Sequence, residues 1–85
     1  MPTISEFFGI VVFMNLNDHI PPHFHARYGG YQATFLLNGE LYKGEFPPTA
    51  KKLIKEWAVL HENTLEITWK KAMNHEELPW IEPLK

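Results

Sequence analysis

Residues 23–40 read HFHARYGGYQATFLLNGE, and their pattern predicts most of the sheet. Apolar and polar residues alternate on both sides of Gly29-Gly30, as they do in strands that bury one face. Gly29-Gly30 and Asn38-Gly39 are each two-residue hairpin signals. The stretch therefore predicts a chain that reverses twice, with strands over residues 23–28, 31–37 and 40–46, the last ended by Pro47-Pro48.

The two tight turns also predict the register of these strands. Pairing Tyr28 with Tyr31 sets Phe24 opposite Phe35, Ala26 opposite Ala33 and His25 opposite Thr34, while pairing Leu37 with Glu40 sets Phe35 opposite Tyr42 and Thr34 opposite Lys43. One face of the sheet then gathers Phe24, Ala26, Tyr28, Tyr31, Ala33, Phe35, Leu37 and Tyr42. The opposite face, which we call the polar face, carries His23, His25, Arg27, Gln32, Thr34, Lys43 and Glu45, with Leu36 and Leu41 at one end.

The segments on either side of this stretch complete the expected fold. Residues 8–16 are rich in β-branched and aromatic side chains and predict a further strand, apolar on both faces. Beyond residue 48 the apolar spacing changes to that of helices. Thr49 is the expected cap of a first helix with the stripe Leu53, Ile54, Trp57, Ala58 and Leu60.

A second helix is expected because Asn63 is followed three residues later by Glu66, as in a capping box. Its apolar stripe is Leu65, Trp69, Ala72 and Met73, and Trp80 and Ile81 are expected to pin the proline-containing tail onto the core. The predicted fold class is α+β, in one domain over residues 1–85. It is a four-stranded antiparallel β-meander with two C-terminal helices packed on one face.

Composition narrows the classes of function. The 85 residues are 45% hydrophobic and contain no cysteine, which excludes disulfides, thiolate zinc sites and cysteine nucleophiles. The formal net charge of −2 means that any contact with nucleic acid would be local. The N-terminus lacks a basic region and no apolar run reaches membrane-spanning length, so we expect a cytoplasmic protein without a membrane partner.

Three of the five histidines lie between residues 19 and 25, beside Asp18. His23 and His25 are two residues apart on a predicted strand, so they point the same way with Cβ atoms about 6.5–7 Å apart. Two imidazoles at that spacing can converge on one metal ion, and His19 or Asp18 can complete the set. One interpretation of the pattern is therefore a site for a divalent metal such as zinc, bound by Asp18, His19, His23 and His25.

Two other readings of the histidines stay open. His23 and His25 could act as acid and base in RNA phosphodiester cleavage, a reaction that needs two groups titrating near pH 7. Lys43 would then be a further catalytic residue, with Arg27, Gln32 and Thr34 contacting the substrate and Arg27 or Lys43 holding phosphate. Alternatively the histidines are structural, with His19 hydrogen-bonded in the turn and His23 and His25 half-exposed on the sheet.

The sequence also resembles a family of small bacterial proteins of unknown function. The resemblance covers essentially the whole chain and rests on residues 1–12, on Asn17-Asp18-His19, on the segment 21–25 and on residues 56–57, 60–61 and 81–84. Some members are labelled toxin–antitoxin components and are encoded beside another small protein. The resemblance implies a small cognate protein partner, and its matching histidines are His19, His23 and His25. Together with the clustered imidazoles it makes a toxin–antitoxin component, RNA-cleaving if it is catalytic, the preferred hypothesis, with the metal-binding or protein-binding module as the alternative.

The last expectation concerns the edges of the sheet. A four-stranded meander leaves an outer strand without a partner, and such an edge invites pairing with another chain. The sequence thus allows a non-catalytic interaction module, including a homodimer formed through an edge strand.

Overall fold

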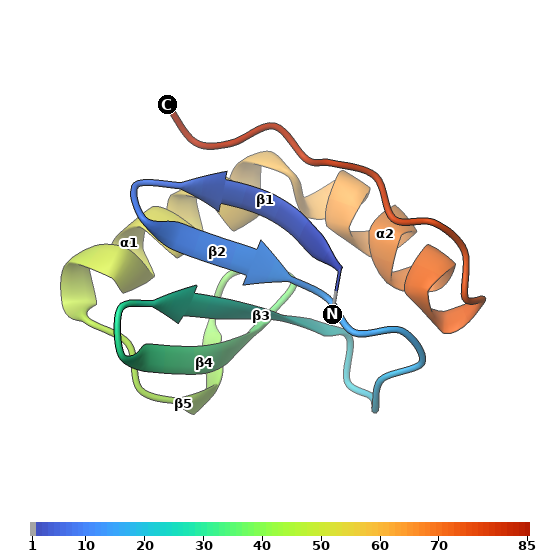
Figure 1. Ribbon diagram of the computed structural model, residues 1–85, viewed down its shortest axis with the longest axis horizontal. Helices are drawn as coiled ribbons and strands as arrows, with labels where there is room; N and C mark the ends of the chain where they lie inside the picture. Colours follow the sequence, from blue (N-terminus) through green and yellow to red (C-terminus); the bar gives the residue numbers. More distant parts are fainter. Residues whose placement is uncertain (1) are drawn as a thin grey trace.

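The computed structural model describes residues 2–85. Within these residues, an antiparallel sheet of five strands lies in front of two helices in Figure 1. The strands follow one another across the sheet in chain order and are β1 (Thr3–Phe7), β2 (Ile10–Phe13), β3 (His23–Tyr28), β4 (Tyr31–Leu36) and β5 (Leu41–Gly44). The helices are α1 (Pro48–Leu60) and α2 (Glu62–Met73). The α+β class and the meander are confirmed, whereas the count of four strands is wrong.

The additional strand is β1, which the sequence analysis did not anticipate. It pairs with β2 through a two-residue turn at Phe8-Gly9, where φ is +49° and +81°. Positive φ at both turn positions is the geometry of the preferred hairpin turns, but phenylalanine at the first position gives no sequence signal for it. Phe8 is therefore a turn residue with 59% of its surface exposed, and not the start of a strand over residues 8–16.

The hairpin of β3 and β4 has the predicted register. Phe24 lies opposite Phe35, His25 opposite Thr34 and Tyr28 opposite Tyr31. The alternation also holds on the face toward the helices, because Phe24, Ala26, Ala33 and Phe35 are all buried. At the hairpin end, Tyr28 and Tyr31 are 38% and 48% exposed, and Tyr42, which lies at an irregularity in β5, is 43% exposed, although all three were predicted to be in the core.

The hairpin of β4 and β5 differs from the prediction by one residue. Leu36 N–H donates to Glu40 O, and Gly39 N–H donates to Leu36 O, so the connection has three residues and not two. Gly39 has a φ of +89°, which suits the bulge that closes such loops. A second irregularity follows in β5, so that Thr34 pairs with Lys43 as predicted but Phe35 pairs with Leu41 and not with Tyr42.

The helices bury most of the predicted stripe against the sheet. Ile54, Trp57, Ala58, Leu65, Trp69 and Ala72 are buried, whereas Leu60 is 69% exposed and does not belong to the core. The helix starts were predicted wrongly. Helix α1 begins at Pro48 after Pro47, since proline at a first helical position needs no N–H partner, and α2 begins at Glu62 directly after His61 without a side-chain cap.

The C-terminal tail runs back past α2 toward β1 (Figure 1). Ile81 is buried, its N–H donates to Ile4 O, and its own carbonyl accepts a hydrogen bond from Ser5 Oγ. Trp57 Nε1 donates to Glu82 O one residue further along. Ile81 therefore pins the tail as predicted, but Trp80 does not, because it is 57% exposed. Neither helix in the described part of the chain is long and apolar enough to span a membrane.

Candidate metal centre

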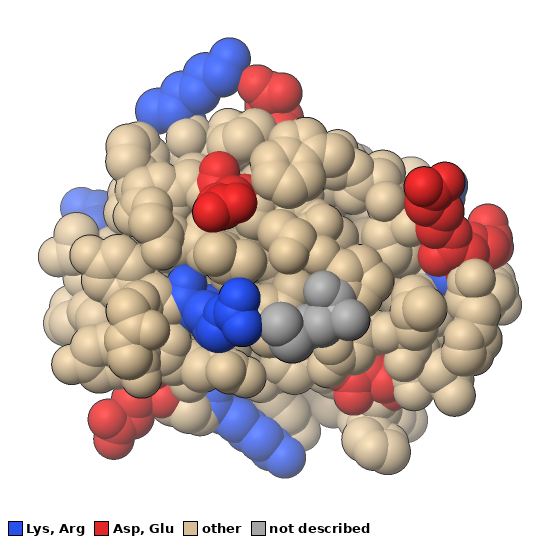
Figure 2. Space-filling view, viewed as in Figure 1, with Lys and Arg blue, Asp and Glu red and all other residues tan. Residues whose placement is uncertain are grey.

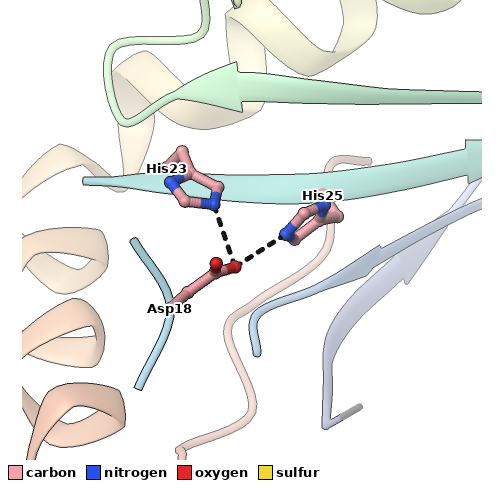
Figure 3. A group of neighbouring side chains, drawn as sticks. All are labelled: Asp18, His23 and His25. Carbon is pink, nitrogen blue, oxygen red and sulfur yellow. Dashed lines mark hydrogen bonds and ion pairs between the residues drawn. The ribbon is translucent and has the colours of Figure 1, made fainter. Parts of the chain in front are cut away.

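The connection between β2 and β3, residues 14–22, folds back over the beginning of β3. Its course is fixed at one point by a hydrogen bond from Asn17 N–H to Ala72 O in the last turn of α2, 3.0 Å long. Asn17 has a φ of +53°, a conformation that asparagine tolerates better than most residues. The next residue, Asp18, therefore lies over one face of β3, with its carboxylate between the imidazoles of His23 and His25 (Figure 3).

The three side chains meet at one carboxylate oxygen. Asp18 Oδ2 is 2.9 Å from His23 Nε2 and 3.0 Å from His25 Nε2. The side chains of His23, His25 and Asp18 are only 8%, 17% and 16% exposed. We call these three residues the Asp–His–His cluster; its ligand atoms all lie within 4.8 Å of one another.

The hydrogen bonds of His23 determine where its protons are. Nδ1 lies 2.7 Å from Pro21 O, and a carbonyl oxygen can only accept, so Nδ1 carries a proton and donates it. In a neutral imidazole, Nε2 would then present a lone pair to the carboxylate of Asp18. Two acceptors at 2.9 Å repel each other, so this contact requires a cation. Either His23 is an imidazolium or a metal ion lies between the two groups.

His25 has more freedom, because the Thr34 hydroxyl can donate or accept, whereas the Asn15 amide nitrogen can only donate. Thr34 Oγ1 lies 3.4 Å from Nδ1, and Asn15 Nδ2 lies 3.3 Å from Nε2. A neutral His25 that donates from Nε2 to Asp18 can accept at Nδ1 from the threonine hydroxyl. Its ring is held by stacking on Phe13, with centroids 5.0 Å apart and planes 10° from parallel. His25 is thus well oriented but does not by itself require a cation.

The pKa of Asp18 reflects this crowded environment. Burial alone would raise the pKa of the carboxyl, but hydrogen bonds from His25, from the backbone N–H of His19 and from His23, together with the charge of His23, outweigh it. They lower the pKa of Asp18 from 3.8 to about 2. The carboxylate is therefore ionised at neutral pH and available as a ligand.

The cluster fits a small divalent ion in both donor type and spacing. Two imidazole nitrogens and one carboxylate oxygen are ordinary ligands of zinc and of other first-row metals. Around a tetrahedral zinc ion such atoms lie about 3.3 Å apart, so the observed 2.9 and 3.0 Å need to open by a few tenths of an ångström. The Nδ1–H of His23 on a backbone carbonyl is also the usual outer-shell contact that orients a metal-binding histidine.

The structure gathers some of the predicted site residues and separates others. Asp18, His23 and His25 come together, whereas His19 is exposed and lies outside the cluster, contributing only its backbone N–H to Asp18 Oδ1 at 2.8 Å. Lys43 lies two strands from His25, about 9.5 Å away across the sheet, with its Nζ over the ring of Tyr42.

Arg27 and Gln32 pair with each other on the exposed part of the polar face. The guanidinium of Arg27 lies over the ring of Phe13, 5.5 Å from its centroid. Figure 2 looks onto this side of the sheet, opposite the helices, and shows few charged side chains across it. Of the predicted substrate-contacting residues, Thr34 alone touches the cluster, through its hydroxyl on His25.

The expectation that His23 is half-exposed is wrong, because this residue is 6% exposed. The loop covers it from one side, and the indole of Trp69 in α2 packs 5.3 Å from its ring on the other. Strand alternation places His23 on the polar face, but it gives no information on the loop and helix that close over the end of that face.

Three groups of this site were missed by the sequence analysis, namely Asn15, the carbonyl of Pro21 and Trp69. Trp69 also lines a hollow of about 380 Å³ on its far side, together with Pro22, Leu36, Leu37, Asn38, Glu66 and Lys70. None of the three cluster residues lines this hollow, so it is a neighbour of the cluster and not its opening. Asn15 could have been found from its position two residues after Phe13, because both side chains lie on the side of His25.

Comparison with known proteins assigns a family but no activity. The model of a domain of unknown function, DUF4160, matches residues 9–70, which include all of the Asp–His–His cluster. The chain therefore belongs to the DUF4160 family. Neither the curated proteins nor the solved structures yielded a significant match.

Proposed function

We propose that this protein binds a divalent transition-metal ion, zinc in the first instance, through Asp18 Oδ2, His23 Nε2 and His25 Nε2. Three protein ligands leave at least one coordination position for water or for another molecule. Because Asp18 comes from the loop and the histidines come from β3, the ion would also fasten residues 14–22 to the sheet. The protein is then a metal-dependent module and not simply a fold with buried histidines.

One observation carries this proposal, which is the contact of His23 with two acceptors. Its Nδ1–H is committed to Pro21 O, and its Nε2 faces an ionised carboxylate at 2.9 Å. A metal ion satisfies Nε2, Oδ2 and the second imidazole at once, without any change of tautomer at His23. The ring is thus already oriented for coordination, which lowers the cost of binding.

The direct test is titration of the metal-stripped protein with Zn²⁺ by calorimetry, and with Co²⁺ by absorption spectroscopy. We expect one equivalent to bind, a melting temperature that rises with metal and falls again with chelator, and Co²⁺ bands typical of low coordination number. His25→Ala should weaken zinc binding at least about 100-fold, because it removes one of only three protein ligands.

Two histidine substitutions serve as controls for that test. His75→Ala changes an exposed histidine outside the cluster and should bind zinc like the wild type. His19→Ala removes the exposed neighbour of Asp18 and decides whether the sequence-based fourth ligand takes part. If the wild-type protein takes up none of Zn²⁺, Co²⁺, Ni²⁺, Mn²⁺ or Fe²⁺ stoichiometrically, the cation at His23 is its own proton and the proposal is wrong.

A second proposal, which follows from the resemblance described above, is a toxin–antitoxin component that cleaves RNA and acts with a small protein partner. His25 supports it best, because its side chain is 17% exposed and borders the polar face that carries Arg27. His23 gives it less support as an acid or base, since both of its ring nitrogens are engaged within the protein.

This second proposal has a separate test. Expression of the chain alone should arrest growth of a bacterial host, and His25→Ala should restore growth while remaining folded by circular dichroism. Lys43→Ala should have little effect, because Lys43 lies two strands from His25. Indifference of the host to the wild-type protein would count against a toxin and would leave the metal-binding proposal untouched.

A further inference from the structure

The outer edge of β5 is a second feature of this protein that is suited to binding. β5 is the last strand in the sheet order, and no strand within residues 2–85 pairs with its outer side (Figure 1). All four of its residues are exposed, including Leu41 at 40% and Tyr42 at 43%. An unpaired edge presents a row of backbone donors and acceptors that an extended chain can match.

Two adjoining hollows lie between this edge and the beginning of α1. One measures about 310 Å³ and the other about 370 Å³, and both are lined by Leu41, Pro48 and Lys51. Phe46 and Tyr31 contribute to the first and Phe35 to the second, so both hollows have apolar walls. A strand added to β5 would direct alternate side chains toward this side, where the hollows can receive them.

The charges around these hollows indicate the kind of chain that fits. Residues 40–55 are locally basic, with four lysines and two glutamates, whereas the rest of the protein has eight acidic and four basic residues. Lys55 is paired with Glu40 at 3.1 Å, but no carboxylate of the described residues forms an ion pair with Lys51 or Lys52. Both lie near the start of α1, whose first turn has no acidic residue and where the helix dipole adds positive potential. Glu45 lines the first hollow and Glu40 the second, where Glu40 is paired with Lys55.

We propose that β5 binds an extended, acidic segment of a partner polypeptide by strand addition, with carboxylates of that segment at Lys51 and Lys52 and apolar side chains in the two hollows. A second copy of the protein fits less well. A two-fold axis at this edge would bring Lys43, Lys51 and Lys52 of both copies together, and like charges facing each other across a sheet are destabilising. This inference is independent of the metal centre.

The test uses a labelled, end-capped peptide of eight residues in which valine and glutamate alternate along one face of the strand and serine occupies the other face, so that both kinds of side chain point toward the hollows. NMR titration should show shifts confined to the amides of residues 41–44 and to the first turns of α1, and fluorescence anisotropy should give a dissociation constant. The double variant Lys51→Glu/Lys52→Glu should weaken binding at least about tenfold. The matched pair Lys70→Glu/Lys71→Glu, on α2, should leave binding unchanged.

A second peptide separates strand addition from simple charge attraction. It has the same side chains but carries N-methyl groups on alternate amides, which removes the donors needed for a ladder. Loss of binding by this peptide supports the proposal. Equal binding of the two peptides, equal loss in both lysine pairs, preferential binding of an octauridylate RNA, self-association through β5, or no binding at millimolar peptide would each overturn it.

Discussion

The sheet is covered in two different ways, and the contrast separates what makes this protein fold from what gives it a site. Two helices cover one face through apolar contacts centred on Trp57, which is fully buried against Phe7 and Phe24. At the other face, one end of β3 is covered by residues 15–22, which follow the buried Met14 and are held by the carboxylate of Asp18 and by a hydrogen bond from Asn17 N–H to Ala72 O. We call the two helices, which are held by buried apolar area, the apolar cover. We call the loop, which is held mainly by the charge of Asp18, the polar cover.

This difference implies that the two covers respond to different perturbations. Apolar burial is insensitive to pH and metal, but it is lost in large steps when a core side chain is truncated. A small polar cluster contributes less free energy, yet it depends strongly on protons and cations. Truncation of a core side chain should therefore act mainly on the helix layer, and a change of pH or metal mainly on the loop.

Truncation of the central indole should give the largest effect. Trp57→Ala removes a fully buried side chain and its hydrogen bond to Glu82 O, and should lower the free energy of unfolding by about 3–5 kcal/mol. Chemical denaturation followed by circular dichroism measures this loss. Trp80→Ala is the matched control and should change stability by no more than about 0.5 kcal/mol, since Trp80 is 57% exposed. Similar losses in the two variants would contradict the assignment of the core.

The apolar cover was largely predictable from the sequence, because it follows from local spacing. Alternation in residues 23–36 and the Gly29-Gly30 turn were sufficient for the pairing of Phe24 with Phe35. The predicted register of β4 with β5 was wrong by one residue at Phe35, which pairs with Leu41, because the loop at Gly39 has three residues and not two. Strand β1 was missed for a related reason, since Phe8 does not resemble a turn residue and the bulge between Thr3 and Ser5 breaks the alternation.

The polar cover was only half predictable. The spacing of His23 and His25 indicated a shared direction, and proximity in sequence suggested Asp18, which does join them. The burial of His23 depends on Trp69, which is 46 positions away, and on a carbonyl that no side-chain pattern identifies. The sequence placed Lys43 and Arg27 on the correct face of the sheet. A shared face does not, however, give the distance between these residues and the Asp–His–His cluster.

The second prediction tests whether the helix layer shapes the β4–β5 hairpin. A Cβ added at Gly39 would lie 2.9 Å from Lys55 Cα of α1, at a φ of +89°. The same change at Gly29, with φ +58°, meets nothing within 4 Å. Gly29→Ala should therefore cost about 1 kcal/mol for its backbone conformation, and Gly39→Ala should cost at least about 1 kcal/mol more. Thermal unfolding of both variants measures the difference, and equal losses would mean that α1 yields to the added methyl group.

The smallest effect concerns the pH dependence of the polar cover in metal-free protein. The pKa of Asp18 is lowered from 3.8 to about 2 by folding, so its carboxylate stabilises the fold above about pH 4 and loses that contribution as the pH falls toward 2. After allowance for solvent screening, the loss should be about 1 kcal/mol. Asp18→Asn keeps the shape of the side chain but removes this titration. The stability curves of wild type and Asp18→Asn, measured by urea denaturation in the presence of chelator, should therefore converge between pH 4 and pH 2. Parallel curves across that interval would mean that the carboxylate gains nothing from its two histidines when the protein folds.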